Sequence, residues 1–210
     1  MTKQDWVEAG LAALVGAGPD AVAIEPVAAS LGATKGSGYW HFANRAALLD
    51  SVLDLWQTRH TEQVIERVEA AGGSPVARLD RLISVVTKVV RESPADILIL
   101  ASQDPAVRAR VTGVVARRIG YIERLLVESG VSRAEARSRA VLAYAAYLGH
   151  AVLEAATPEA LPHSAAARRR MQHGMLRLAL PDDDAEGSTT SARPTRGRPR
   201  TGRPTRAEGA

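Results

Sequence analysis

Apolar residues recur every three or four positions along most of this chain, which is the spacing of a helix with one buried face. Between residues 3 and 180 no stretch keeps the two-residue alternation of a half-buried strand. The first helix is expected over residues 3–17, where one face carries Val7, Leu11, Leu14 and Val15. Gly18-Pro19 ends it, because proline cannot continue a helix. The pattern predicts an all-α protein.

Two short helices and then one long helix are expected next. The first covers residues 24–31 and ends at Gly32, and the second begins at Thr34, a residue type favoured just before a first helical turn. Asn44, which is favoured in the same position, precedes a long helix over 45–69. The two short helices cannot bury their own apolar faces. We therefore expect them to pack on the first helix as a three-helix unit.

Four longer helices and one short apolar segment are expected before residue 181. They cover about 76–92, 96–102 (the short segment), 105–129, 133–156 and 164–180. Residues 181–210 differ, since they are rich in Pro, Gly, Ser, Thr, Arg and Asp and hold no large apolar side chain. Such a segment cannot bury enough surface to offset the chain entropy lost on folding, so we expect it to be disordered.

Composition narrows the class of protein. Of the 210 residues 46% are hydrophobic and only 4% are aromatic, so alanine, valine and leucine must pack the core. The absence of cysteine excludes disulfides and fits a reducing compartment. The N-terminal stretch is acidic where a secretory leader is basic, and no apolar run approaches the roughly 18 residues of a membrane span. We expect a cytoplasmic protein with no membrane contact.

Residues 24–40 have the anatomy of a helix-turn-helix. A short helix with apolar Val27, Ala28 and Leu31 is followed by a tight turn at Gly32 and by a second short helix with polar and aromatic residues. In such a unit the second helix enters the major groove of DNA, and the first helix crosses the phosphate backbone. The sequence therefore predicts binding to double-stranded DNA.

The motif also carries a family resemblance. The run from Val27 to Phe42, which reads VAASLGATKGSGYWHF, resembles the signature of TetR-type repressors, and the residues up to Leu49 continue it. The resemblance implies an N-terminal three-helix helix-turn-helix DNA-binding domain over residues 1–48. It further implies a C-terminal helical domain for effector binding and dimerisation over 49–180. Residues 181–210 then form a basic tail.

The resemblance places the DNA contacts on the second helix of the motif. The residues expected near phosphates or base edges are Thr34, Lys35, Gly36, Ser37, Tyr39, Trp40 and His41. Phe42 would instead fill the small core. Taken singly, the aromatic residues could be core residues and Lys35 a solvated charge, but the joint pattern favours a DNA-reading surface.

Two residues depart from the family pattern, and the charge of this region is unusual. Gly38 stands where a larger apolar side chain is usual. Because glycine costs a helix interior about 0.5–1 kcal/mol relative to alanine, we expect a loose helix in the absence of DNA. Ala23 stands where a threonine often contacts phosphate. Residues 1–50 hold three basic and five acidic side chains, which is a poor balance for binding a polyanion.

The C-terminal tail could supply the missing positive charge. Residues 187–206 hold six arginines and no acidic residue, whereas residues 1–186 hold 21 basic and 22 acidic side chains. The run Arg196-Gly197-Arg198-Pro199-Arg200 resembles the core of an AT-hook, and Gly202-Arg203-Pro204 repeats part of it. An extended backbone with flanking arginines fits the narrow minor groove of A·T tracts. The alternative is an unspecific basic tail.

Residues 141–153 indicate a self-association surface. They are apolar all round except at His150, so a helix there is expected to be buried on more than one side. One side can meet the domain core and another a second copy of the chain, with the last helix completing a four-helix interface. A homodimer would present two motifs to the halves of a palindromic operator. The family resemblance implies the same arrangement.

The resemblance also implies a small-molecule pocket in the larger domain. The residues expected to line it are Trp56, Tyr121, Tyr144, Tyr147 and His150. Each of them could instead be a core residue with a satisfied hydroxyl or ring nitrogen. Because these helices hold few polar residues, the expected effector is apolar or aromatic.

The expected function is a DNA-binding transcriptional regulator, a homodimeric repressor that a small apolar or aromatic molecule releases from its operator. We predict no enzyme activity, cofactor or metal, because the sequence shows no nucleophile–base set, metal-ligand cluster or phosphate-cradling glycine loop. Two alternatives stay open. The chain could be an architectural protein that coats A·T-rich DNA through its tail, or a regulator that senses a protein partner.

Overall fold

The computed structural model describes residues 1–92 and 99–181, and every regular element in these ranges is helical, which confirms the all-α prediction. The α-helices are α1 (Lys3–Ala17), α2 (Ile24–Ser30), α3 (Lys35–His41), α4 (Arg45–Gln57), α5 (Gln63–Ala70), α6 (Pro75–Glu92), α8 (Pro105–Glu128), α9 (Arg133–Ala156) and α10 (Ala165–Ala179). Shorter elements are the 3-10 turns η1 (Pro19–Ala21) and η3 (Pro158–Ala160) and the π-helical segment η2 (Thr58–Glu62). Residues 96–98 of the short apolar segment expected over 96–102 lie outside the described residues.

The helices begin and end where the sequence places capping residues. At the starts of α3, α4, α8, α9 and α10 a capping side chain accepts a hydrogen bond from a backbone N–H of the first turn. The capping residues are Thr34, Asn44, Asp104, Ser132 and Ser164. At the other ends, Gly18 and Gly32 take φ angles of 83° and 62°, a region that side chains disfavour. These local signals explain why most helix boundaries are readable in the sequence.

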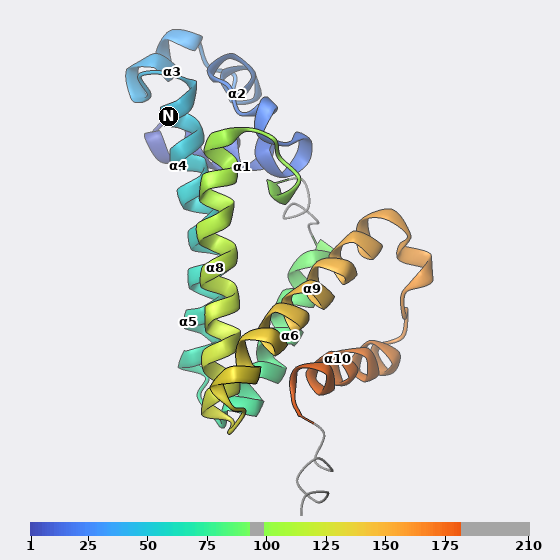
Figure 1. Cartoon of the computed structure of the whole chain (residues 1–210). Coiled ribbons are helices and arrows are strands. Elements are labelled where there is room, and N and C mark those ends of the chain that lie inside the picture. Colours follow the sequence, from blue (N-terminus) through green and yellow to red (C-terminus); the bar gives the residue numbers. More distant parts are fainter. Residues whose placement is uncertain (93–98, 182–210) are drawn as a thin grey trace, which may run out of the picture.

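The molecule is elongated, with α1, α2 and α3 at one end and α6, α9 and α10 toward the other (Figure 1). α4, η2 and α5 follow one another without a break and form a rod along the long axis, where the sequence predicts a single helix. α8 runs beside this rod (Figure 1). Both the rod and α8 therefore connect the N-terminal end of the molecule to the larger helical region.

The N-terminal core extends into α8. Its buried residues include Trp6, Leu14 and Phe42, and the same apolar cluster contains Val107 and Val114 of α8. Arg110, between these two valines, donates to Asp50 Oδ1 of α4 at 2.7 Å. α8 is therefore packed into the N-terminal domain by apolar contacts and held to α4 by ion pairing.

Gly38 is explained by the close packing of two helices, whereas the sequence predicts that it loosens α3. It is buried in the middle of α3, and a Cβ at this position would overlap the indole ring of Trp6 and the side chain of Ile24. A larger apolar residue therefore cannot occupy this position while Trp6 fills the core. The glycine lets α3 approach α1 closely, which accounts for it without a loosened helix.

A second apolar cluster joins α5, α6, α8, α9 and α10, and its members include Val68, Leu79, Tyr121, Leu125, Leu126, Ala136, Ala140 and Tyr144. A polar network borders this core. Glu69 accepts hydrogen bonds from Tyr121 Oη at 2.7 Å, from Arg78 at 2.9 Å and from Arg124 at 3.0 Å. Across the parts of the chain that the structure describes, no helix combines the length and apolar character needed to cross a bilayer.

Candidate DNA-binding interface and ligand pocket

α2 and α3 form a helix-turn-helix at the tip of the molecule (Figure 1). The turn is tight, because Gly32 has a positive φ and the Ala33 N–H donates to the Ala28 carbonyl at 2.9 Å. Thr34 Oγ1 accepts from the Ser37 N–H at 3.3 Å and so defines the first turn of α3. The geometry is that of the motif predicted from the sequence.

Most residues expected to contact DNA lie on the outside of α3. Five of the seven are exposed, namely Thr34, Lys35, Gly36, Tyr39 and Trp40, and the other two, Ser37 and His41, are half-buried. Tyr39 is 53% and Trp40 83% exposed, although aromatic side chains are mostly buried in folded domains. Phe42, in contrast, is buried in the core, as expected. Contact of these residues with DNA stays a prediction.

The basic residues of this region are already engaged within the protein. Lys35 Nζ lies 3.5 Å from Glu25 Oε1 in an exposed ion pair, which contributes little to stability. Arg45 Nη2 donates to the Pro19 carbonyl at 2.8 Å, and Arg45 Nη1 lies 3.4 Å from Asp104 Oδ2 at the start of α8. The tip of the molecule therefore offers little uncompensated positive charge to a phosphate backbone.

The arginine-rich tail lies outside the described residues, which end at Pro181. The AT-hook-like run Arg196–Arg200 and the partial repeat at Arg203 belong to it. Their contribution to DNA binding therefore stays a prediction from the sequence.

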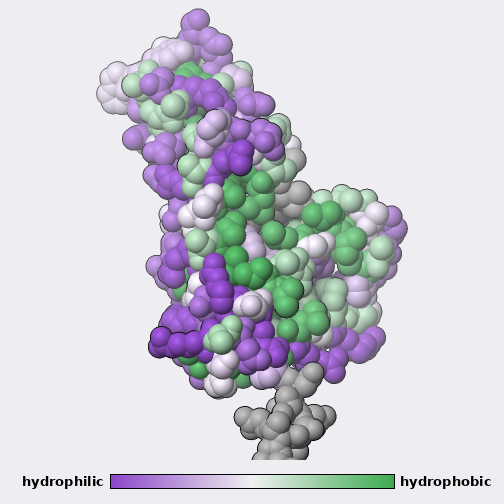
Figure 2. Space-filling view, in the orientation of Figure 1, coloured by the Kyte–Doolittle hydropathy of each residue, from purple (hydrophilic) through white to green (hydrophobic). Residues whose placement is uncertain are grey.

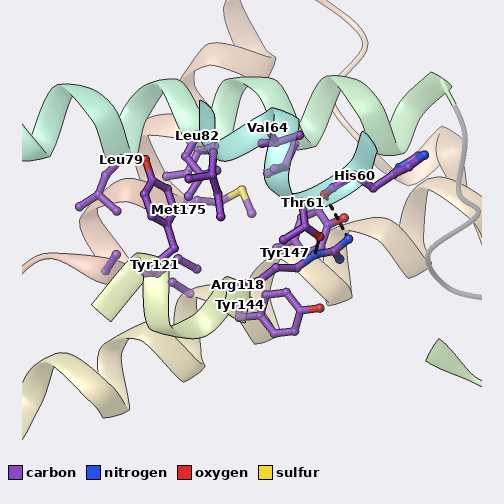
Figure 3. Close-up of a pocket in the computed structure, with 16 residues that line it drawn as sticks. His60, Thr61, Val64, Leu79, Leu82, Arg118, Tyr121, Tyr144, Tyr147 and Met175 are labelled. Atoms are coloured by element: carbon purple, nitrogen blue, oxygen red, sulfur yellow. Dashed lines mark hydrogen bonds between the residues drawn. The ribbon is translucent and has the colours of Figure 1, made fainter. Parts of the chain in front are cut away.

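A cavity lies in the larger region between η2, α5, α6, α8, α9 and α10 (Figure 3). Its volume, taken as the space open to the centre of a water molecule, is about 80 Å³. Most of the wall is aliphatic and consists of Val64, Ile65, Leu79, Leu82, Ile83, Val86, Ile122, Ala143, Met175 and Ala179. Ligand pockets usually measure about 300–1,000 Å³. A ligand of that size would therefore have to move the surrounding helices apart.

The polar part of the wall is gathered around Arg118 of α8. The Arg118 Nε donates to Thr61 Oγ1 at 3.0 Å, and its Nη2 donates to the His60 carbonyl at 3.2 Å. Both acceptors belong to η2, and Figure 3 shows the three residues at the same end of the cavity as Tyr144 and Tyr147. π-helical segments occur frequently at functional sites. Here the segment supplies the polar end of the cavity.

Three of the five pocket residues expected from the sequence line this cavity, and they are Tyr121, Tyr144 and Tyr147. The rings of Tyr144 and Tyr147 lie 5.7 Å apart between centroids. Burial raises the pKa of Tyr121, and its hydrogen bond to Glu69 raises that pKa further. Because the Tyr121 hydroxyl is bonded to Glu69, we conclude that this residue presents its ring to the cavity.

Trp56 and His150 are placed elsewhere than the cavity wall. Trp56 is fully buried in the N-terminal core, and the Arg118 guanidinium carbon lies 5.4 Å from the centre of its ring. His150 is buried on α9, with Nε2 3.6 Å from Glu154 Oε1. Burial lowers the pKa of His150, while the Glu154 carboxylate acts in the opposite direction. Sequence patterns show that such residues are internal but not which space they face.

Arg118, His60 and Thr61 were not expected at the pocket. Polar residues on a helix usually face solvent, and no motif distinguishes these three from others of their type. The apolar side of the cavity has a visible signal, because Leu79, Leu82 and their neighbours form the regular stripe on α6.

α9 carries an exposed apolar face (Figure 2). Leu142 is 63% and Leu153 44% exposed, and Ala145 and Gly149 between them are exposed as well. On α10, Leu178 is another exposed large apolar side chain. Exposed apolar surface is a feature of protein–protein interaction sites.

Comparison with solved structures shows that the whole fold has precedents. A TetR-family transcriptional regulator from Streptomyces coelicolor matches with a TM-score of 0.68 at 15% identity, over 84% of this chain and 87% of that one. A TetR transcriptional regulator from Legionella pneumophila matches with a TM-score of 0.67 at 11% identity, over 83% and 95%. The transcriptional regulator FadR from Bacillus subtilis, in complex with stearoyl-CoA, matches with a TM-score of 0.64 at 13% identity, over 85% and 98%.

Sequence comparison agrees for the N-terminal domain. No curated protein sequence matches this chain significantly. Residues 7–52, which span the helix-turn-helix and the start of α4, match the family model of the bacterial regulatory proteins of the tetR family. The helix-turn-helix region of the chain thus matches the tetR family of bacterial regulatory proteins, and the fold as a whole is the one seen in solved TetR-family transcriptional regulators.

Proposed function

We propose that this regulator is a homodimeric repressor that leaves a palindromic operator when a small apolar molecule enters the cavity. The observation that carries the proposal lies in η2. Arg59 donates to the two carboxylate oxygens of Glu8 in α1, at 2.7 and 2.5 Å, and the next two residues, His60 and Thr61, line the cavity. A single short segment therefore contacts both the DNA-binding domain and the pocket.

α8 provides a second connection between the two regions. At its start Asp104 pairs with Arg45, and Val107 packs into the N-terminal core. About four turns further along, Arg118 lines the cavity. A ligand too large for the present cavity would displace α8 or η2, and close-packed helices transmit such shifts. The ligand can change the affinity for DNA only as far as it binds the displaced arrangement of the helices more tightly than the present one.

The exposed face of α9 supports self-association. Leu142, Ala145, Gly149 and Leu153 follow one another at helical spacing along a single side of α9. The small residues in the middle would let a second helix approach closely, and the large apolar residues at either end would be removed from water. We propose that α9 and α10 of two copies form this interface. Two helix-turn-helix motifs would then face one palindromic site.

The structural neighbours support a cavity that takes an apolar molecule. FadR from Bacillus subtilis has this fold and is in complex with stearoyl-CoA, which carries a long hydrocarbon chain. For the present chain, this precedent and the aliphatic wall favour a small-molecule effector over a protein partner.

The arginine-rich tail has a place in the proposal as a source of affinity. Because Arg45 and Lys35 are engaged by other residues, we propose that the six arginines of residues 187–206 neutralise phosphates near the operator. In this arrangement α3 selects the site, and the tail and dimerisation hold the protein there.

Selection of bound sequences from a random DNA pool tests the proposal. The full chain and a chain ending at residue 186 should both select one palindromic sequence, since both contain the helix-turn-helix and the dimer surface. Enrichment of A·T-rich DNA without a dyad, seen only with the full chain, would reject the operator and favour the architectural alternative.

A further inference from the structure

The packing of Gly38 determines which side of α3 faces away from the protein. This glycine lies against Trp6 and Ile24, so its side of the helix meets the domain core. An α-helix turns by about 100° per residue, and positions two before and two after Gly38 therefore point to the opposite side. These positions are Gly36 and Trp40, and both are exposed at the tip of the molecule (Figure 1). We call this pair the outer ridge of α3.

Trp40 provides the one large side chain on the outer ridge. It is 83% exposed, more than any other large apolar side chain that the structure describes. The ring of His41 lies edge to face with it, 4.7 Å away between centroids, and so restricts its orientation. Gly36, one turn earlier, has only Thr34 Oγ1 near its missing Cβ, at 3.8 Å. The backbone of α3 can therefore approach base edges closely, with the indole beside them.

The chemistry of α3 limits which base it can read in the major groove. Guanine is read by arginine or lysine, adenine by asparagine or glutamine, and cytosine by an acidic side chain. Of these residue types, residues 34–41 contain only one, Lys35. Its Nζ lies 3.5 Å from Glu25 Oε1 of α2. The helix is therefore poorly equipped to read bases through hydrogen bonds.

An apolar group suits the outer ridge better. The indole of Trp40 has a single N–H donor, and the rest of its surface is apolar. Thymine presents its C5 methyl group in the major groove, where side chains recognise it by apolar contact. Tyr39 and Ser37 stand about 100° from Gly38 on either side, on the flanks of the helix. They are therefore placed nearer to the phosphate backbones than to the base edges.

We infer that Trp40 determines the sequence of the operator by contact with a thymine methyl group in each half-site. This inference deepens the proposed function, on which it rests for the entry of α3 into the major groove. It names the base that α3 reads and the side chain that reads it.

Deoxyuridine tests the inference, because it differs from thymidine only in lacking the C5 methyl group. Each thymidine of the duplex that the full chain selects from a random pool is replaced in turn, and fluorescence anisotropy gives the dissociation constants. At one position or more in each half-site we expect binding to weaken about three- to tenfold, and elsewhere by less than about twofold. At the sensitive position 5-methylcytosine should bind more tightly than cytosine, because it carries a methyl group at the same place.

Two neighbouring aromatic residues give the matched variants. Trp40→Ala should bind the thymidine and deoxyuridine duplexes equally, whereas Tyr39→Ala should weaken both and keep their ratio. Because the ratio is taken within one protein, a general loss of affinity or stability cancels. If Trp40→Ala binds too weakly to measure, Trp40→Leu replaces it and should show a reduced ratio. An unchanged ratio in the Trp40 variant would contradict the inference.

The same duplexes separate this inference from the proposed function. A selected palindrome in which no methyl group matters would reject the inference and retain the operator. A methyl-sensitive site without a dyad, whose sensitivity is lost in Trp40→Ala, would support the inference and reject the homodimeric operator. A pool from which no sequence is enriched would overturn both.

Discussion

Gly38 of α3 lies so close to the indole of Trp6 in α1 that no side chain fits between them. A Cβ on Gly38 would stand 2.6 Å from Trp6 Cη2 and 2.7 Å from Ile24 Cγ2. The core around this contact is close-packed, so an added atom can be accommodated only by moving whole groups. The contact thus sets the position of α3 on the domain that supports it.

Gly38→Ala is therefore expected to destabilise the protein by about 1–3 kcal/mol, because the added methyl group overpacks the core. Urea unfolding followed by circular dichroism measures the change. Gly36→Ala is the matched control on the same helix. A Cβ at Gly36 would have only Thr34 Oγ1 nearby, at 3.8 Å, so the better helix propensity of alanine should raise stability by up to about 1 kcal/mol. Equal stability of the two variants would contradict the packing account.

The network at Glu69 predicts a loss of stability in acid. The hydrogen bonds from Tyr121 and Arg78, together with the positive charges of Arg124 and Arg78, hold the pKa of Glu69 below its ordinary value. A carboxyl group whose pKa is lower in the folded than in the unfolded chain stabilises the fold above the unfolded pKa. This contribution is lost as the pH falls through the folded pKa.

We expect the urea midpoint of the wild type to fall between about pH 6 and pH 3.5, and to fall less for Glu69→Gln. Glu66→Gln provides the control, because Glu66 is an exposed carboxylate one turn earlier on α5. If Glu69→Gln showed the same pH dependence as Glu66→Gln, the network would have no role in acid unfolding.

Deletion of residues 187–210 should weaken operator binding and flatten its dependence on salt. Each phosphate neutralised adds about −0.9 to the slope of log K against log salt concentration. The six arginines could therefore steepen the slope by up to about five. Fluorescence anisotropy at several salt concentrations gives both slopes. Removal of residues 207–210 alone leaves all six arginines and should change nothing. Equal slopes for the full and shortened chains would reject a contribution from the tail.

The double variant Leu142→Glu, Leu153→Glu should be monomeric. The two leucines lie eleven positions apart, about three turns, and so on the same side of α9. Two charges there would oppose burial against a second copy. Analytical ultracentrifugation measures the state, and operator affinity should fall about 100-fold or more because only one half-site is then engaged. Val76→Glu, at an exposed apolar position on α6, should remain dimeric. A dimeric double variant would place the interface elsewhere.

The sequence predicts the helices well because capping residues stand at their ends. Ser132 and Asn44 accept hydrogen bonds from backbone N–H groups at the positions expected from residue type alone. η2 has no capping side chain, and its hydrogen bonds with Arg118 join it to a helix that is distant in the sequence. The role of Gly38 is hidden for a related reason, because it depends on Trp6 in another helix.

The residues that line the pocket are also set by contacts between distant parts of the chain, which the sequence pattern does not show. Tyr144 and Tyr147 were expected to line it and do so, whereas Trp56 was expected there and lies in the N-terminal core. All three are internal, and hydrophobic spacing indicates burial but does not say which cavity a side chain meets. Arg118 was not expected because its own helix, α8, meets η2 only in the folded chain.

Because the three tryptophans differ in exposure, their intrinsic fluorescence can report on different parts of the protein. Trp6 and Trp56 are fully shielded, whereas Trp40 is 83% exposed. A shielded indole emits at shorter wavelength than a solvated one, and dissolved iodide quenches only the solvated ring. DNA on α3 should therefore protect Trp40 from iodide, and a ligand that displaces Arg118 should alter the emission of Trp56. Occupancy of the operator and of the cavity could then be followed in one unlabelled sample.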